Sequence, residues 1–133
     1  MNMAKIKKPS ISKLFSDAKK SKNATKCGMF LLHNGTVRVD AKIKVREGKK
    51  GTKKVTGMIF DYDKKKVDTA IKKALKLPGI YYIKVWLNNG KLKLGDDIML
   101  VLVGGDIRPH VIDCLQSLVG EIKTKCVIEN ELY

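Results

Sequence analysis

The spacing of apolar residues predicts three amphipathic helices along the chain. The first covers about residues 10–20, with Ser10 or Ser12 as its N-cap, because a hydroxyl there can accept a backbone N–H of the first turn. The other two cover residues 64–77 and about 109–122. The residues expected on the buried faces are Ile11, Leu14, Phe15 and Ala18; Val67, Ala70, Ile71, Ala74 and Leu75; and Val111, Ile112, Leu115 and Leu118 or Val119.

Seven shorter segments have the continuous or alternating apolar pattern of β-strands. They cover residues 27–32, 36–45, 55–62, 80–87, 91–94, 98–103 and 125–128. Turn-forming residues separate several of them: residues 33–35 are expected to end the first strand, and residues 104–106 to break the sixth. Residues 46–54 are rich in Gly and Lys and lack an apolar anchor, which predicts a flexible surface loop.

This order of elements indicates an α+β fold with a mostly antiparallel sheet and about three helices. A chain of 133 residues is long enough to bury one hydrophobic core without disulfides or metals. We expect a single domain over residues 10–133, preceded by a flexible basic tail over residues 1–9.

The strongest compositional signal is a net charge of +15, from 28 Lys and Arg against 13 Asp and Glu. Such an excess attracts polyanions, which include nucleic acid, a phosphorylated substrate and an acidic protein partner. The lysines are scattered over every segment, however, and aromatic residues make up only 6%, which leaves few surfaces for stacking bases. General solubilisation by lysine therefore explains the charge better than a nucleic-acid interface does.

The cysteines and the apolar runs are typical of a cytoplasmic protein. Cys27, Cys114 and Cys126 match no metal motif and are expected to be reduced, mostly buried thiols. A bridge between Cys27 and Cys126 would require that their strands pair. The longest apolar run, residues 98–103, is too short to span a bilayer, and no secretory signal follows the basic start.

The histidines and carboxylates do not indicate a metal centre. His33 ends an apolar strand and is expected to be structural. His110 lies in the last helix, where a plain surface histidine is the favoured interpretation and contact with a ligand the alternative. No pair of carboxylates or cysteines has the spacing of metal ligands. We therefore expect neither a metal nor a bound cofactor.

Four basic residues mark candidate anion sites, each with an equally sufficient structural explanation. Arg38 follows the turn after the first strand, and Arg108 lies at the start of the third helix, whose N-terminus favours an anion. Lys123 and Lys125 follow that helix, where cations stabilise the helix C-terminus. Composition and spacing alone thus indicate a basic α+β domain with possible anion sites.

The order of several motifs resembles the large, catalytic-subunit family of molybdopterin synthase. The family's Gly-x-Val-Arg turn is matched by Gly35–Arg38, and its Gly-x-Leu-x-x-Gly-Asp motif by Gly90–Asp96, before an apolar strand. The spacing from Arg108 to Lys123 agrees with the family without a gap. The resemblance covers roughly residues 10–131 and implies an α/β hammerhead type of fold.

The resemblance implies a sulfur-transfer reaction in molybdenum cofactor biosynthesis. Such subunits convert cyclic pyranopterin phosphate to molybdopterin, and the sulfur arrives on a ubiquitin-like small subunit with a C-terminal Gly-Gly thiocarboxylate. Two large subunits form a central homodimer. By this likeness Lys123 is the catalytic residue beside the thiocarboxylate, while Arg38 and Arg108 bind the substrate, a role that suits the bidentate guanidinium.

Several family positions differ in this chain. Ile107 replaces the histidine that precedes the arginine, Asn130 replaces a second lysine, and Glu129 replaces a tryptophan. His110 and Lys125 are the candidates to substitute for the missing histidine and lysine in substrate binding. Two hypotheses therefore remain: a divergent synthase subunit, or a relative without sulfur transfer that binds a pterin, a ubiquitin-like protein or nucleic acid.

Overall fold

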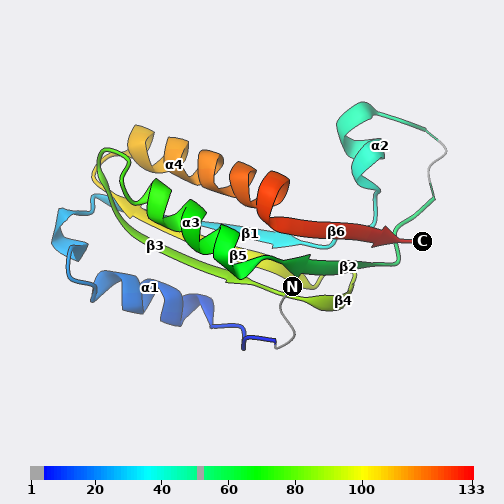
Figure 1. Ribbon diagram of the computed structural model, residues 1–133, viewed down its shortest axis with the longest axis horizontal. Coiled ribbons are helices and arrows are strands. Elements are labelled where there is room, and N and C mark those ends of the chain that lie inside the picture. Colours follow the sequence, from blue (N-terminus) through cyan, green and yellow to red (C-terminus); the bar gives the residue numbers. More distant parts are fainter. Residues whose placement is uncertain (1–4, 51–52) are drawn as a thin grey trace.

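Two three-stranded antiparallel sheets form the framework of the protein (Figure 1). The computed structural model describes residues 5–50 and 53–133. In the first sheet, the order is β1 (Met29–Thr36), β5 (Asp97–Gly105), β3 (Ile80–Leu87). In the second, the order is β4 (Gly90–Lys93), β2 (Gly57–Tyr62), β6 (Val127–Leu132). The α+β class and the antiparallel pairing predicted from the sequence are confirmed.

The central strand β5 organises the first sheet. Its residues from Ile98 to Gly105 are all buried, as expected for a strand covered on both faces. β1 pairs with it from Met29↔Gly105 to Thr36↔Asp97, so the C-terminal end of β1 lies beside the start of β5. At this end of the sheet, the connection after β1 therefore lies beside the loop before β5. At the other end, the loop before β1 lies beside the loop after β5.

Helices cover both faces of this sheet (Figure 1). On one face α1 (Ile11–Lys19), capped by the Ser10 hydroxyl, packs Leu14 and Ala18 against Trp86, Leu100 and Leu102. On the other face α3 (Lys64–Ala74), capped by the Asp63 carboxylate, and α4 (Arg108–Glu121) bury their apolar sides in the main core. A short 3-10 helix, Ala24–Lys26, leads from α1 into β1.

The end of α4 leads directly into the second sheet. Residues Ile122–Cys126 continue the helix as a π-helical turn, and β6 follows at Val127. The short helix α2 (Lys42–Glu47) stands near the C-terminal end of β6 (Figure 1). Gly48 ends α2 in the left-handed conformation, with φ 63°, where an L side chain is disfavoured.

The predicted strand over residues 36–45 is wrong. Apart from Thr36, which ends β1, the segment consists of a connection and most of α2. Val37 and Ala41 are buried, whereas Val39, Ile43 and Val45 are exposed. The alternating apolar residues therefore do not share one buried face. Alternation alone does not make a strand, because a strand also needs a neighbouring strand with which to pair.

Two predicted strand ends are also wrong. β1 continues through residues 33–35, which pair with β5, and β5 continues through Gly104 and Gly105, which pair with Phe30 and Met29. A Cβ at Gly104 would lie 2.6 Å from the Phe30 ring, so close packing explains this glycine. Gly104 is therefore explained by the close approach of Phe30 on β1 to β5. It does not mark a turn of the chain.

Smaller differences concern the buried face of α4 and the last strand. Val111 and Leu118 are buried as predicted, but Ile112 is exposed and Cys114 is buried in its place. β6 starts later and runs further than the predicted strand at 125–128. All three cysteines are free, and two of them, Cys114 and Cys126, are buried, as expected.

The described part of the expected N-terminal tail contacts the first sheet. The indole Nε1 of Trp86 donates to the carbonyl oxygen of Ile6 at 2.9 Å. The Lys8 ammonium lies 2.8 Å from the Asp97 carboxylate. Within the described ranges, no helix has the length and hydrophobicity needed to cross a membrane.

Candidate functional site

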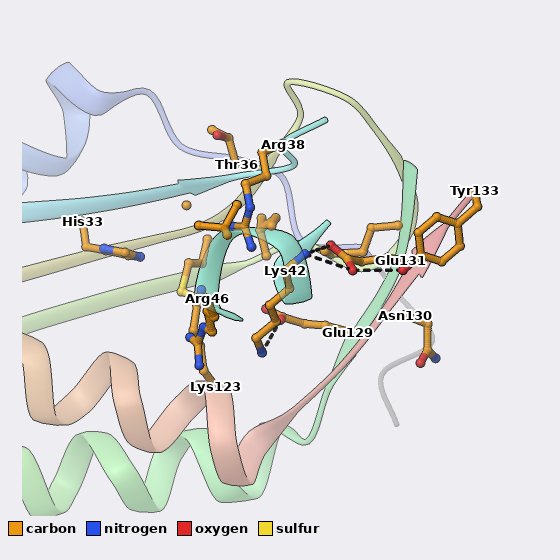
Figure 2. A pocket seen from close by; sticks show the side chains of 15 residues that line it. His33, Thr36, Arg38, Lys42, Arg46, Lys123, Glu129, Asn130, Glu131 and Tyr133 are labelled. Carbon is orange, nitrogen blue, oxygen red and sulfur yellow. Dashed lines mark hydrogen bonds and ion pairs between the residues drawn. The ribbon is translucent and has the colours of Figure 1, made fainter. Parts of the chain in front are cut away.

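A cavity of about 450 Å³ opens at the C-terminal end of β1. Its walls come from six parts of the chain: the end of β1 with the following connection, α2, β2, the start of β5, the π-helical turn, and β6 with Tyr133 (Figure 2). The lining residues are His33, Gly35, Thr36, Arg38, Lys42, Val45, Arg46, Met58, Ile98, Met99, Lys123, Glu129, Asn130, Glu131 and Tyr133.

Four cationic side chains converge on this cavity. Arg38 comes from the connection after β1, Lys42 and Arg46 from α2, and Lys123 from the π-helical turn (Figure 2). Within the described residues, Arg38, Arg46 and Lys123 form no ion pair with a carboxylate. Uncompensated cations in a concave site produce a positive potential, so the cavity is suited to an anionic ligand.

Two carboxylates of β6 face the same cavity. Glu129 and Glu131 alternate with Asn130, whose side chain points to the other side of the strand (Figure 2). Glu131 accepts the backbone N–H of Lys42 at 3.0 Å and the Tyr133 hydroxyl at 3.2 Å. The ammonium of Lys42 lies 3.9 Å from Glu129. These contacts tie the start of α2 to β6.

His33 lines the cavity, although the sequence indicated only a structural role. Burial, and secondly the positive charge of Lys123, lower the pKa of its imidazole below the usual value. Its Nε2 atom is buried and has no hydrogen-bond partner among the residues that the structure describes. The turn residues at 33–35 predict that the strand ends before His33, and this hides the alternation that places His33 and Gly35 on the same side of β1.

The predicted site residues fall into three separate places. Arg38 and Lys123 line the cavity together. Lys125 borders a different depression, between α3 and the π-helical turn. Arg108 and His110 lie at the start of α4, whereas Lys123 follows its end. The 14 residues of α4 span about 20 Å at about 1.5 Å per residue, so one protomer cannot bring Arg108 and Lys123 together.

His110 is held by a local network at the start of α4. Its Nδ1 lies 2.7 Å from Oδ1 of Asp106, and this hydrogen bond is the main reason that the pKa of Asp106 is lowered. The same oxygen accepts the backbone N–H of Ile107 at 2.6 Å. Gly79, at φ 76°, packs so closely against Asp106 and His110 that a Cβ would clash with both. Each of these contacts orders the loop before α4.

The cavity can bind an anion and place the ammonium of Lys123 beside it. The described residues contain no group of three or more His, Cys, Asp or Glu that could hold a metal ion. The lining residues supply hydrogen bonding and charge stabilisation by Arg38, Arg46, Lys42 and Lys123, together with the imidazole of His33.

Comparison with known proteins agrees with this description. A sequence model of a protein family, described as MoaE protein, matches residues 6–125. No curated protein matches the chain significantly. The fold is similar to the crystal structure of molybdopterin synthase from Staphylococcus aureus, with a TM-score of 0.71 and 17% identity over 94% of this chain and 86% of that chain.

Two further structures show the same fold. A MoaE protein of molybdopterin biosynthesis from Burkholderia ambifaria has a TM-score of 0.70 at 16% identity, over 95% of this chain and 84% of its own. A complex of subunits 1 and 2 of the molybdopterin-converting factor from Helicobacter pylori contains a chain with a TM-score of 0.64 at 17% identity. The match covers 92% of this chain and 82% of that chain.

Proposed function

Because the chain belongs to the MoaE protein family, which acts in molybdenum cofactor biosynthesis, we propose that it is the large subunit of a molybdopterin synthase. In this role it transfers sulfur from a thiocarboxylated small subunit to cyclic pyranopterin phosphate, and the product is molybdopterin. We expect the reaction to take place in the cytoplasm.

The observation that carries this proposal is the meeting of Arg38 and Lys123 in one cavity. They are 85 positions apart in the sequence, and both were singled out through the family resemblance. Arg38 can hold a phosphate by two parallel hydrogen bonds. The ammonium of Lys123 can stabilise the negative charge that develops when the thiocarboxylate carbonyl is attacked. Lys42 and Arg46 add to the positive potential that attracts the substrate.

The proposed partner is a ubiquitin-like small subunit whose C-terminal Gly-Gly thiocarboxylate enters the cavity. The Helicobacter pylori structure is a complex of two subunits, which supports a two-subunit assembly here. Val45 and Tyr133 line the cavity and are exposed, so they offer an apolar contact to an extended tail at its mouth.

A homodimer would resolve the separation of Arg108 from Lys123. In a dimer with two-fold symmetry, the α4 start of one protomer can lie at the cavity of its partner. Arg108 would then bind substrate in the partner's cavity, with His110 nearby. Lys125, which borders a separate depression, has no direct part in this arrangement.

A non-catalytic binding module is the second candidate, and the acidic residues of β6 favour it. Glu129 and Glu131 place two carboxylates in a cavity that would bind an anion, which lowers its positive potential. Asn130 supplies no cation, and its side chain points away from these carboxylates (Figure 2). Such a module would bind a pterin or a ubiquitin-like protein without sulfur transfer; nucleic acid is a weaker candidate.

Reconstitution with two lysine variants tests the proposal. Purified protein is mixed with a thiocarboxylated small subunit and cyclic pyranopterin phosphate, and molybdopterin is measured. We expect Lys123→Ala to lower the rate by roughly a hundredfold or more, the loss typical of one charge-stabilising donor. Lys125→Ala removes the same charge two residues away and should keep most of the activity.

The outcomes separate the two candidates. Product that requires both additions and Lys123 supports the synthase. Absence of product from the unaltered protein, with the small subunit still bound in a pull-down, supports the binding module. Equal activity of Lys123→Ala and the unaltered protein would show that Lys123 has no catalytic role.

A further inference from the structure

Two walls of the cavity each hold a buried polar atom that has no hydrogen-bond partner within residues 5–50 and 53–133. One is Nε2 of His33 on β1, and the other is Oε1 of Glu129 on β6. Buried polar atoms are nearly always paired in folded proteins, and an unpaired one costs free energy. Both atoms face the same cavity, so one ligand bound there can complete both hydrogen bonds.

Glu129 is the more informative of the two. Its side chain is only 14% exposed, and its nearest cation, the Lys42 ammonium, lies 3.9 Å from the other oxygen, Oε2, which is beyond hydrogen-bond distance. Glu131, by contrast, uses its carboxylate to accept from the Lys42 backbone and from the Tyr133 hydroxyl. The carboxylate of Glu129 thus keeps its acceptor capacity for a ligand.

The charge distribution restricts the chemistry of that ligand. Arg38, Arg46 and Lys123 favour an anionic group, whereas the Glu129 carboxylate, held only by the 3.9 Å ion pair with Lys42, favours donors. A ligand that satisfies both has a phosphate and, apart from it, adjacent N–H donors matched to the two oxygens of a carboxylate. The 2-amino and N3–H groups of a pterin ring form such a pair.

We propose that Glu129 recognises the 2-amino-N3–H edge of the pterin, an inference that rests on the proposed function. The ring lies between β6 and β1, with its phosphate toward the cations, and the Nε2 atom of His33 meets a polar group on the side of the ring opposite Glu129. The side chain of Lys42 is 47% exposed, and its ammonium lies 3.9 Å from Glu129. When the ring binds, this ammonium moves away from Glu129 and contacts the phosphate.

Two fluorescent probes test this inference without sulfur transfer. One is 6-hydroxymethylpterin monophosphate, and the other is the corresponding lumazine, which has an oxygen in place of the 2-amino group. Dissociation constants are measured from probe fluorescence. The unaltered protein should prefer the pterin by roughly tenfold or more, because the lumazine places an acceptor against the carboxylate.

Isosteric variants locate the source of that preference. Glu129→Gln should weaken pterin binding by roughly tenfold to a hundredfold and reduce the preference to near unity, because it removes the charge and one of the two acceptors. Glu131→Gln changes the same charge in the same cavity and should keep the preference. Glu129→Asp keeps the charge but withdraws the carboxylate, so its preference for the pterin should lie between those of Glu129→Gln and Glu131→Gln. Unfolding temperatures establish that each variant folds.

Each outcome decides the matter. A pterin preference that survives Glu129→Gln, or that Glu131→Gln removes equally, overturns the assignment while the proposed substrate stands. Failure of the unaltered protein to bind either probe or cyclic pyranopterin phosphate overturns the substrate itself. Loss of the preference in Glu129→Gln alone establishes the contact.

Discussion

Lys123 and Lys125 show how the function of single residues depends on local geometry. Both lie in the π-helical turn after α4, yet only Lys123 reaches the cavity, while Lys125 borders another depression. Side chains two positions apart on a helical turn point in nearly opposite directions. Composition treats these lysines as equivalent, so only the family resemblance distinguished Lys123 beforehand.

His33 provides a prediction at the same scale. Burial and the charge of Lys123 lower its pKa in the folded protein below the unfolded value of about 6.5. Between these two pKa values the unfolded chain binds more protons, so stability falls as pH drops through about 6.5 and levels off below the folded pKa. This loss of folding stability is absent well above pH 6.5, where the imidazole is neutral in both the folded and the unfolded state.

Replacement of the imidazole should remove that part of the pH dependence. On lowering the pH from 7.5 through the unfolded value of about 6.5, we expect His33→Gln to lose less unfolding temperature than the unaltered protein. Thermal unfolding followed by circular dichroism measures the difference. The carboxylates titrate in both proteins and cancel; identical pH dependence would contradict the role assigned to His33.

At the scale of elements, the N-terminal segment before α1 packs against the first sheet. Trp86, the single tryptophan, is 6% exposed and donates to the carbonyl oxygen of Ile6. The Lys8 ammonium pairs with Asp97, and this hydrogen bond is the main reason that the pKa of Asp97 is lowered. The segment therefore covers one edge of the cluster that α1 forms with Trp86, Leu100 and Leu102.

Deletion of residues 1–9 tests this packing. The indole would lose its acceptor and meet water, so its fluorescence emission should shift to longer wavelength. Lys8→Met serves as the control, because it removes the ion pair and leaves the backbone carbonyl of Ile6 in place. An emission spectrum that is unchanged by the deletion would mean that the segment does not cover Trp86 in solution.

The segment after β1 shows which elements periodicity can predict. The helices α1, α3 and α4 and the strands β2, β3 and β4 follow from the sequence within a few residues, because each buries one regular face. Residues 36–45 also alternate, but Val37 and Ala41 are held by separate contacts. After Thr36, none of the described strands pairs with this segment, so most of it forms a connection and part of α2.

At the scale of the whole molecule, the positions of Arg108 and Lys123 predict a shared active site. If each cavity combines Lys123 of one protomer with Arg108 of its partner, Lys123→Ala and Arg108→Ala should both be inactive alone. When the two variants assemble together, half of the dimers are mixed and one cavity in each is intact. Activity should then return to about a quarter of the unaltered level.

The measurement is the reconstitution assay on co-expressed and separately purified variants. Arg38→Ala mixed with Lys123→Ala provides the matched control, because these residues belong to the same cavity of one protomer. That pair leaves no intact cavity and should stay inactive if protomers contribute as proposed. Recovery in the control, or none with Arg108→Ala, would argue against a shared site.

The sequence by itself determined the fold class, most of the regular elements and the family. These follow from local periodicity, from a capping residue such as Ser10, and from motifs with fixed spacing. It also identified Arg38 and Lys123, which the structure places in one cavity. Information of this kind is local, or is carried by order along the chain.

Only the tertiary structure decided which charged residues share a site. The antiparallel pairing of β1 with β5, and the return of α4 along the sheet, bring Arg38 and Lys123 together and carry Arg108 and His110 to the other end. It also brought His33 and Glu129 to the same cavity, each with a buried atom that no other described residue pairs. Side-chain burial and hydrogen-bond satisfaction depend on segments distant in sequence, so no local pattern reveals them.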